Sequence, residues 1–249
     1  MPETLPTIAS LAPLTNVAAT LTALLSAAER PSGLPGLLCL YGRSGYGKSS
    51  AAAYAANKFR AYYVELKSLW TTKHLLLNIL REMGIVPAGT VAEMLDQVCE
   101  QLSLSGRPLI LDQADYLIDK GRAPLLMDLY EGSKAPILFI GEERLSTAMK
   151  ARNNTVHRRV LHWIEAQPAS LDDCRQLARL YCRGLDVSDD LLEHVNRAVE
   201  GCTGRVAVNL NLIGERAGVQ GWERIDLARW KGQSGAEQRL YTGEPGRRG

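Results

Sequence analysis

The sequence predicts an α/β fold in which a parallel sheet is covered by helices on both faces. Short, continuous apolar runs, typical of strands that are buried on both sides, recur along the chain. Between them lie longer stretches with apolar residues three and four positions apart, a spacing that predicts helices. This alternation is typical of parallel strands joined by crossover helices. The expected strands are Leu37–Tyr41, Tyr62–Leu66, Leu109–Leu111, Ile137–Ile140 and Val160–Ile164.

Capping residues indicate where several helices begin and end. Asn16 is expected to cap a helix near the N-terminus. A second helix is expected over residues 72–83, with Gly84 as its stop signal. Thr90 and Glu93 have the spacing of a capping box, which predicts a helix over 90–102.

The alternation of strands and helices ends at Pro168. From there only helices are expected: one opened by Ser170 with Asp173, one opened by Ser188 and one over 204–217. The stretch 167–169 is the expected hinge. The predicted parts are a leader with one helix (1–35), a core (36–167), a small helical lobe (168–230) and a polar, glycine-rich tail expected to be disordered (231–249).

The stretch LLCLYGRSGYGKSS, residues 37–50, contains the pattern GxxxxGKS between a buried strand and an alanine-rich helix. Such glycines let the backbone turn so that successive N–H groups face phosphate oxygens, and the following helix adds the positive end of its dipole. The lysine would reach the β and γ phosphates. The motif predicts binding of a nucleoside triphosphate, taken as ATP, by Gly42, Arg43, Ser44, Gly45, Tyr46, Gly47, Lys48, Ser49 and Ser50.

A second part of this site is expected at the end of the strand PLILD. Asp112 closes this buried run and is interpreted as the carboxylate that holds Mg²⁺ through its water shell, opposite the Ser49 hydroxyl. ATP and Mg²⁺ are therefore the expected cofactors.

The residue after Asp112 is Gln113, where a carboxylate would be expected to activate the attacking water. A neutral amide can position water but cannot take its proton. Asp115 could substitute, or could instead cap a helix. We therefore hypothesise that hydrolysis is slow and that ATP acts chiefly as a ligand for conformational change and assembly.

Composition excludes several other classes. The chain has 249 residues, is 46% hydrophobic and carries a net charge of +2, so it is not a strongly basic nucleic-acid clamp. It contains neither a secretory signal nor an apolar run long enough for a membrane helix, so a cytoplasmic location is expected. Its five cysteines are odd in number and far apart, and indicate neither disulfides nor zinc.

Taken together, these motifs resemble those of an AAA+ ATPase, a P-loop NTPase. The resemblance covers residues 11–230 and includes the phosphate loop, DQAD after the third strand, APILFIG as the fourth strand, an arginine pair before the fifth and Gly204-Arg205 in the helical lobe. Within that class, PLTNV at 13–17, WTTKHLLLNILREMGI and LILDQADYL are similar to the transposition protein B family of Mu-like phages and its IstB-like and TniB-like relatives.

The resemblance implies a five-stranded parallel sheet of order 5-1-4-3-2 with a small C-terminal helical lid. It also implies ATP bound between neighbouring protomers, which form helical filaments or rings around duplex DNA. By position, Arg158 or Arg159 would be the finger that reaches the γ-phosphate of the adjacent subunit, and Arg205 would be the lid's sensor arginine. The implied catalytic set is Lys48, Asp112, Gln113, Arg158, Arg159 and Arg205.

The chain departs from that family at two positions of the site. An acid usually stands where Gln113 lies, and a small polar residue usually follows the fourth strand, where this chain has Gly141-Glu142. Glu142 could orient water, although we favour the interpretation that it begins the next helix. The leader is also expected to be too short for the additional N-terminal DNA-binding domain of the Mu protein.

DNA contacts are expected from loops after the second and third strands, which line the bore in that family. A helical assembly repeats each contact along the backbone, so a few cations per protomer would suffice for salt-sensitive binding without sequence preference. The candidates are Lys67, Lys73, Lys120, Arg122, Lys150 and Arg152.

The sequence thus favours an ATP-dependent, non-specific DNA-binding protein that oligomerises on target DNA, delivers it to a transposase and activates that enzyme. One alternative is a helicase loader, which would prefer single strands. Another is an NTP switch whose oligomers bind protein partners and no nucleic acid.

Overall fold

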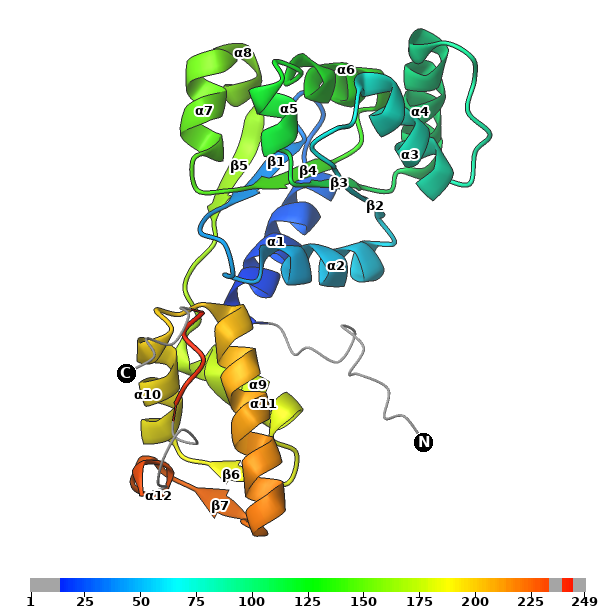
Figure 1. Cartoon of the computed structure of the whole chain (residues 1–249). Coiled ribbons are helices and arrows are strands. Elements are labelled where there is room, and N and C mark those ends of the chain that lie inside the picture. The colour runs from blue at the N-terminus through cyan, green and yellow to red at the C-terminus, as the bar shows by residue number, and fades with distance from the viewer. Residues whose placement is uncertain (1–13, 233–238, 244–249) are drawn as a thin grey trace. The chain divides into compact units, whose positions relative to one another are not determined.

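The computed structural model describes residues 14–232 and 239–243 and separates into two compact units (Figure 1). The sheet unit comprises Val17–Arg43 and Lys48–Ala166. The helical unit comprises the described parts of Met1–Asn16, Ser44–Gly47 and Gln167–Gly249. The expected hinge at 167–169 falls where the helical unit resumes, and motion about it stays a prediction.

The sheet unit is built on five parallel strands in the order β2-β3-β4-β1-β5. Read from the other edge, this is the order 5-1-4-3-2 that the resemblance implied, so the predicted fold is confirmed. The strands are β1 (Leu37–Tyr41), β2 (Tyr62–Glu65), β3 (Leu109–Asp112), β4 (Ile137–Gly141) and β5 (Val160–Glu165).

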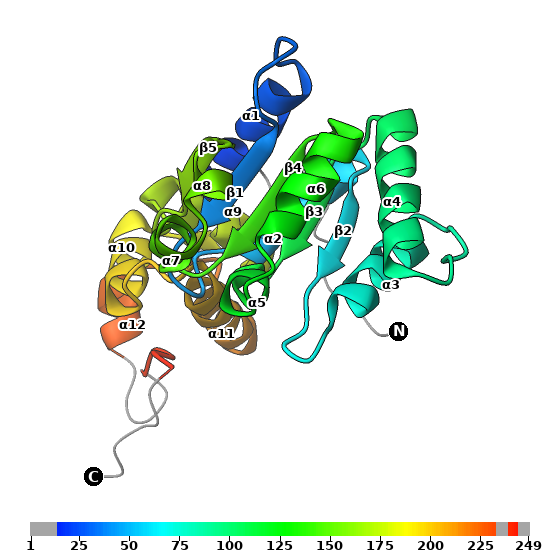
Figure 2. The same cartoon turned by 90° about the horizontal axis from the view of Figure 1, so that it is seen from above.

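Helices cover both faces of this sheet (Figures 1 and 2). On one face lie α1 (Thr15–Ala28) and α2 (Lys48–Phe59); α3 (Thr72–Glu82) and α4 (Val91–Ser105) lie beside β2 at the edge. The other face carries α5 (Asp115–Asp119), α6 (Pro124–Ser133), α7 (Leu145–Arg152) and α8 (Asn154–His157).

The central strands form the core because their side chains are apolar on both faces. Strands β3 and β4 are buried along their whole length, and β1 is buried up to Leu40. The edge strands differ: β2 alternates between buried and half-buried residues, and β5 is half-buried. Since all five strands run the same way, their carboxyl ends share one edge of the sheet.

The helical unit contains α9 (Leu171–Tyr181), α10 (Asp189–Ala198), α11 (Thr203–Gln220) and α12 (Leu227–Lys231). It also contains β6 (Asp186–Val187) and β7 (Arg224–Ile225), which pair in parallel. The expectation of helices alone after Pro168 is therefore wrong, because two-residue strands are too short to leave a periodic pattern. No helix within the described residues is both long and apolar enough to cross a bilayer.

The predicted tail lies mostly outside the described residues. Of its described positions, Lys231 ends α12, and the backbone of Tyr241 exchanges two hydrogen bonds with the Asn209 side chain, at 2.6 and 3.0 Å.

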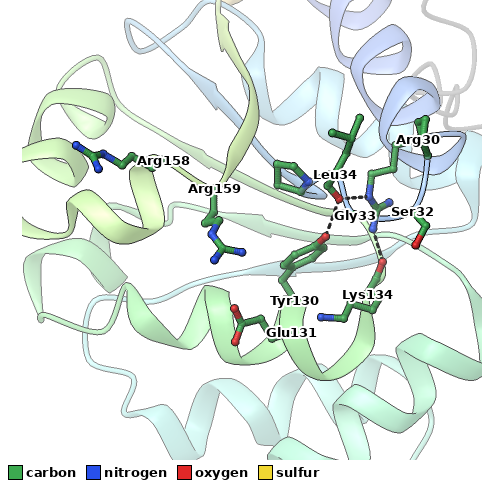
Figure 3. Close-up of a pocket in the computed structure, with 11 residues that line it drawn as sticks. Arg30, Ser32, Gly33, Leu34, Tyr130, Glu131, Lys134, Arg158 and Arg159 are labelled. Carbon is green, nitrogen blue, oxygen red and sulfur yellow. Dashed lines mark hydrogen bonds between the residues drawn. The ribbon is translucent and has the colours of Figure 1, made fainter.

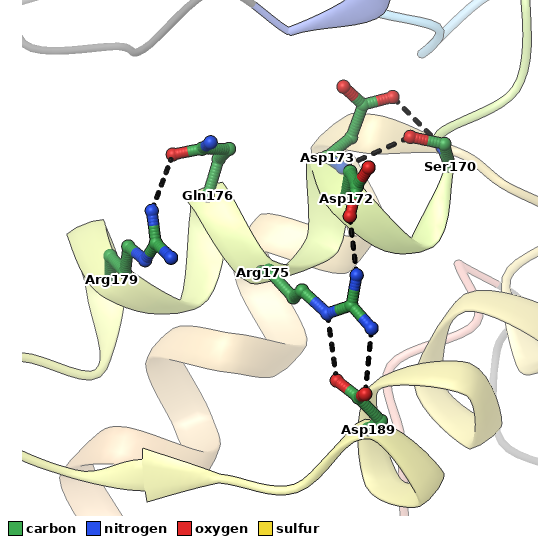
Figure 4. Close-up of polar contacts among 7 residues, drawn as sticks. All are labelled: Ser170, Asp172, Asp173, Arg175, Gln176, Arg179 and Asp189. Carbon is green, nitrogen blue, oxygen red and sulfur yellow. Dashed lines mark hydrogen bonds and ion pairs between the residues drawn. The ribbon is translucent and has the colours of Figure 1, made fainter.

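Both predicted capping boxes are present, at Thr90 with Glu93 and at Ser170 with Asp173 (Figure 4). The prediction that Asn16 caps the first helix is wrong, because α1 begins at Thr15. The Thr15 N–H instead donates to Asp173 Oδ1 at 2.7 Å, and its hydroxyl donates to Oδ2 at 2.9 Å. One carboxylate therefore caps the starts of both α1 and α9.

Asp173→Ala is expected to lower the free energy of unfolding by about 2 to 4 kcal/mol, measured by urea denaturation. The reason is that Asp173 is only 6% exposed and its removal leaves the N–H groups of Thr15 and Ser170 without their acceptor. Asp172→Ala is the matched control: this neighbouring side chain is 82% exposed and pairs with Arg175, which also binds Asp189 (Figure 4). Equal losses in the two variants would contradict the shared-cap interpretation.

Candidate nucleotide-binding site

The phosphate-loop motif forms the connection between β1 and α2, as its setting predicted. Gly42, Gly45 and Gly47 have φ values of 148°, 85° and 79°, a region that side-chain-bearing residues rarely adopt. A Cβ at Gly42 would lie 3.0 Å from that of Ala166. The glycines are therefore required by the turn itself, and the helix that follows points its N-terminus at the loop.

Lys48, the first residue of α2, is only 8% exposed. Its ammonium donates hydrogen bonds to the carbonyl oxygens of Gly42, at 2.6 Å, and Arg43, at 2.9 Å. The Glu142 carboxylate lies 3.9 Å away. The lysine charge is thus held at the loop, where the motif predicts phosphate.

The tip of the loop, Ser44–Gly47, packs within the helical unit. The Gly45 carbonyl accepts the Gly204 N–H at 3.2 Å, and the Tyr46 carbonyl accepts the Asn16 amide at 2.8 Å. A Cβ at Gly45 would lie 2.4 Å from the Cys202 sulfur. Contacts from Asn16 and from the segment 202–204 therefore fix the backbone of the tip.

Asp112 ends β3 and is 4% exposed. Its carboxylate accepts the Tyr63 hydroxyl at 2.8 Å and the backbone N–H of Gln113 at 2.8 Å. Burial, followed by the charge of Asp112, raises the pKa of Tyr63, which therefore stays a neutral donor. Sequence reasoning missed Tyr63. Its only signal was its place two residues before Glu65, on one face of β2.

Gln113 adopts a φ of 57°, and its side chain is directed toward β2. The amide Nε2 donates to Glu65 Oε1 at 2.8 Å, and Lys67 Nζ donates to the same oxygen at 2.7 Å. Register pairs Glu65 with Asp112, which explains the contact between neighbouring strand ends. Glu65 is a second residue that the sequence analysis did not single out.

Asp115 and Glu142 meet at the ends of β3 and β4. The backbone N–H of Glu142 donates to Asp115 Oδ2 at 2.8 Å, and burial raises the pKa of Asp115. Asp115 is the first residue of α5 and provides no side-chain cap there. The favoured interpretation of Glu142 is wrong, because α7 begins only at Leu145, and the Glu142 side chain faces Lys48 instead.

Ser49 and Asp112 fit a magnesium ion that arrives with a triphosphate. Ser49 is exposed in the first turn of α2, and within the described residues its hydroxyl has no hydrogen-bond partner. The Asp112 carboxylate has acceptor capacity beyond its two bonds. The described residues contain no group of three or more histidine, cysteine or acidic side chains that could hold a metal by themselves.

The two expected finger residues, Arg158 and Arg159, directly precede β5 at the amino edge of the sheet (Figure 3). They line a cavity of about 710 Å³ with Arg30, Lys134 and a single acid, Glu131. Both arginines are exposed, and neither guanidinium has a hydrogen-bond or ion-pair partner among the described residues. This cavity therefore has a net positive lining.

Arg205, the expected sensor residue, lies in the first turn of α11 and is exposed. Its guanidinium lies against Gly243, where a Cβ would be 2.6 Å away. Its role toward nucleotide stays a prediction.

Three of the expected DNA-contacting cations bind backbone carbonyls. Lys120 donates to the carbonyl oxygens of Ser68 and, at 3.1 Å, Trp70. Arg122 donates to the same Trp70 oxygen at 2.8 Å, and Lys73 donates to Gly89 at 3.2 Å. Because carbonyls carry no net charge, these three cations remain uncompensated at their sites.

The other three candidates differ among themselves. Lys67 pairs with Glu65 at 2.7 Å, and Arg152 pairs with Asp119 at 2.9 Å, so both charges are locally balanced. Lys150 is exposed on α7 and has no partner within the described part of the chain.

Comparisons with known proteins agree with this architecture. Residues 32–149 match the family model described as an AAA domain. No curated protein matches the chain in sequence.

Among solved structures, the ORC2 protein of Aeropyrum pernix in its ADP form is similar, with a TM-score of 0.63 and 19% identity. That match covers 84% of this chain but only 63% of ORC2, so the chain spans less than two thirds of that relative. Domain III of the Thermotoga maritima replication initiation protein DnaA has a TM-score of 0.56 at 17% identity, over 90% of this chain and 92% of that one. The Thermotoga maritima RuvB Holliday junction branch migration motor has a TM-score of 0.58 at 16% identity, over 89% and 70%.

Tyr63→Phe is expected to lower the free energy of unfolding by about 1 to 3 kcal/mol in a denaturant titration, because the buried Asp112 carboxylate loses a donor. Tyr54→Phe is the control, since the Tyr54 hydroxyl on α2 has no partner in the described residues, and we expect no measurable change. A loss of the same size at both positions would mean that the Tyr63 hydroxyl is not specifically required.

Proposed function

Because residues 32–149 match an AAA domain and the sheet has the strand order expected of the AAA+ fold, we propose that the chain binds and slowly hydrolyses ATP. The observation that carries this proposal is the glycine turn with the Lys48 ammonium held at it, together with Asp112 at the end of β3 on the same edge of the sheet. When bound, Mg²⁺ would neutralise phosphate charge between Ser49 and Asp112. The cytoplasmic location expected from the sequence is part of the same proposal.

The two edges of the sheet support an assembly in which copies share each site. The phosphate loop follows the carboxyl end of β1, whereas Arg158 and Arg159 precede the amino end of β5. The arginine pair of one copy therefore lies at the edge opposite its own loop and is available to the triphosphate of the next copy. Such head-to-tail contacts are heterologous and generate either a ring or a helical filament.

Duplex DNA is the proposed ligand of that assembly, bound without sequence preference. Support comes from Lys120, Arg122 and Lys73, whose charges are not balanced by carboxylates, and from the free Lys150. Repetition of these cations along a filament would compensate for a net charge of only +2 per chain. Delivery of DNA to a transposase and activation of that enzyme rest on the resemblance to the transposition protein B family.

We expect ATP and duplex DNA together to convert the protein into filaments or rings visible by electron microscopy. Lys48→Ala, which removes the phosphate-binding cation, and Arg158→Ala/Arg159→Ala, which removes the proposed finger, should both abolish assembly. Only the second should still bind nucleotide. Arg81→Ala is the control, because this exposed arginine on α3 has no partner in the described residues.

Each other outcome of that experiment selects a different function. Preference for single-stranded DNA would favour a helicase loader. Nucleotide-dependent oligomers that ignore DNA at low salt would favour a protein-recruiting switch. Protein that stays monomeric with saturating ATP and DNA would overturn the proposal.

Steady-state hydrolysis by the wild type is expected to stay below about one ATP per second, the low end of ordinary enzymes. Gln113→Glu should raise it, since a carboxylate at this position can take the proton of water and is repelled from Glu65 toward the site. Gln113→Ala, which adds no carboxylate, should not raise it. A wild type that turns over faster than this limit would contradict slow hydrolysis.

A further inference from the structure

The Gln113 side chain leaves the proton-accepting role of the proposed ATPase unfilled. An amide oxygen is a poor base, and this amide is held at Glu65, 2.8 Å away on β2. If the chain hydrolyses ATP, as proposed above, another group must receive the proton that the attacking water loses.

Besides Glu142, four carboxylates with contacts of their own lie at the carboxyl edge of the sheet within the described residues: Glu65, Asp112, Asp115 and Glu165. Glu165 is the last residue of β5, and its charge contributes to the raised pKa of Tyr41. Asp112 is buried and bonded to Tyr63 and the Gln113 backbone. Asp115 holds the backbone N–H of Glu142. Glu65 binds both Lys67 and Gln113 on the edge strand β2, which is separated from β1 by β3 and β4.

Glu142 remains, and the topology brings it next to the phosphate loop. It follows Gly141, whose partner across the β1–β4 ladder is Tyr41, the residue before the loop. Glu142 Oε1 lies 3.9 Å from Lys48 Nζ. The carboxylate therefore stands beside the group expected to contact the β and γ phosphates.

The surroundings of Glu142 also suit a proton acceptor. Its side chain is 53% exposed, so water can reach it, while its backbone is fixed by the bond to Asp115.

We propose that Glu142 is the general base of the reaction and that this acid after β4 takes the role expected of an acid at position 113. An amide stands at position 113 after β3, where that family usually has an acid, and an acid stands at position 142 after β4, where it usually has a small polar residue. In the step, the water oxygen forms a bond to Pγ while the bond from Pγ to the β–γ bridging oxygen breaks. Glu142 takes the proton of the water, ADP leaves with the electron pair, and the proton is then released to phosphate or solvent.

The test compares single variants with a double variant that places the acid at position 113 and the amide at position 142. It uses the full chain with duplex DNA and saturating ATP. Glu142→Gln should lower kcat by about 100-fold or more, the usual contribution of a general base. Its affinity for ATP should be unchanged or higher, because a negative charge beside the phosphates is removed. The double variant Gln113→Glu/Glu142→Gln should regain at least tenfold over Glu142→Gln, which a purely structural role would not produce.

Glu143→Gln is the matched control, since the adjacent Glu143 is exposed and has no partner in the described residues. The inference is overturned if Glu142→Gln retains kcat within threefold, if it loses ATP binding, if the double variant shows no recovery, or if the wild type binds ATP without hydrolysing it. None of these results would exclude ATP-dependent assembly on DNA. A wild type that binds no ATP would overturn both proposals.

Discussion

The candidate nucleotide-binding site at the carboxyl ends of the strands depends on one nearly buried charge, the Lys48 ammonium. A cation removed from water is costly unless hydrogen bonds and an opposite charge replace its hydration. Here the carbonyl oxygens of Gly42 and Arg43 and the Glu142 carboxylate supply that replacement. The carbonyl of residue 42 can be presented in this way because a glycine tolerates φ 148° there. The requirement of one ammonium thus ties the loop after β1 to the end of β4.

The parallel order of the strands divides the chemistry of the sheet unit between two edges. Asp112, Glu142 and the phosphate loop gather at the carboxyl ends, whereas Arg158 and Arg159 stand at the amino ends. β1 has five residues, so these edges are about 15 Å apart. Over that distance in salt, the guanidinium groups cannot neutralise the carboxylates of their own copy.

Much of the fold was predictable because strands and helix starts leave recognisable patterns in short stretches of sequence. Continuous apolar runs identified all five strands of the sheet, and the capping boxes at Thr90 and Ser170 identified the starts of two helices. The order of the strands followed only from the resemblance to a family. The two-residue strands β6 and β7 left no pattern, since nothing in two residues distinguishes a ladder from a loop.

The site was predictable only where it is contiguous in sequence. The phosphate loop and Asp112 follow from spacing, whereas the partners of their side chains come from distant parts of the chain. Asn16 has the residue type of a helix cap, but its side-chain amide donates to the carbonyl oxygens of Tyr46 and Gln167 instead. These tertiary contacts are not visible in the local sequence. The contact of Gln113 with Glu65 likewise depends on strand register, which single-sequence patterns do not specify.

Lys120 and Arg122 both donate to the carbonyl oxygen of Trp70, which joins the loop after β2 to the segment that follows Asp112. These two loops therefore cannot shift independently without breaking charge-assisted hydrogen bonds. If a ligand that favours one arrangement of the joined loops changes the affinity for nucleotide, it does so by a definite factor. Thermodynamic linkage then requires that nucleotide change the affinity for that ligand by the same factor, so the dependence runs equally in both directions.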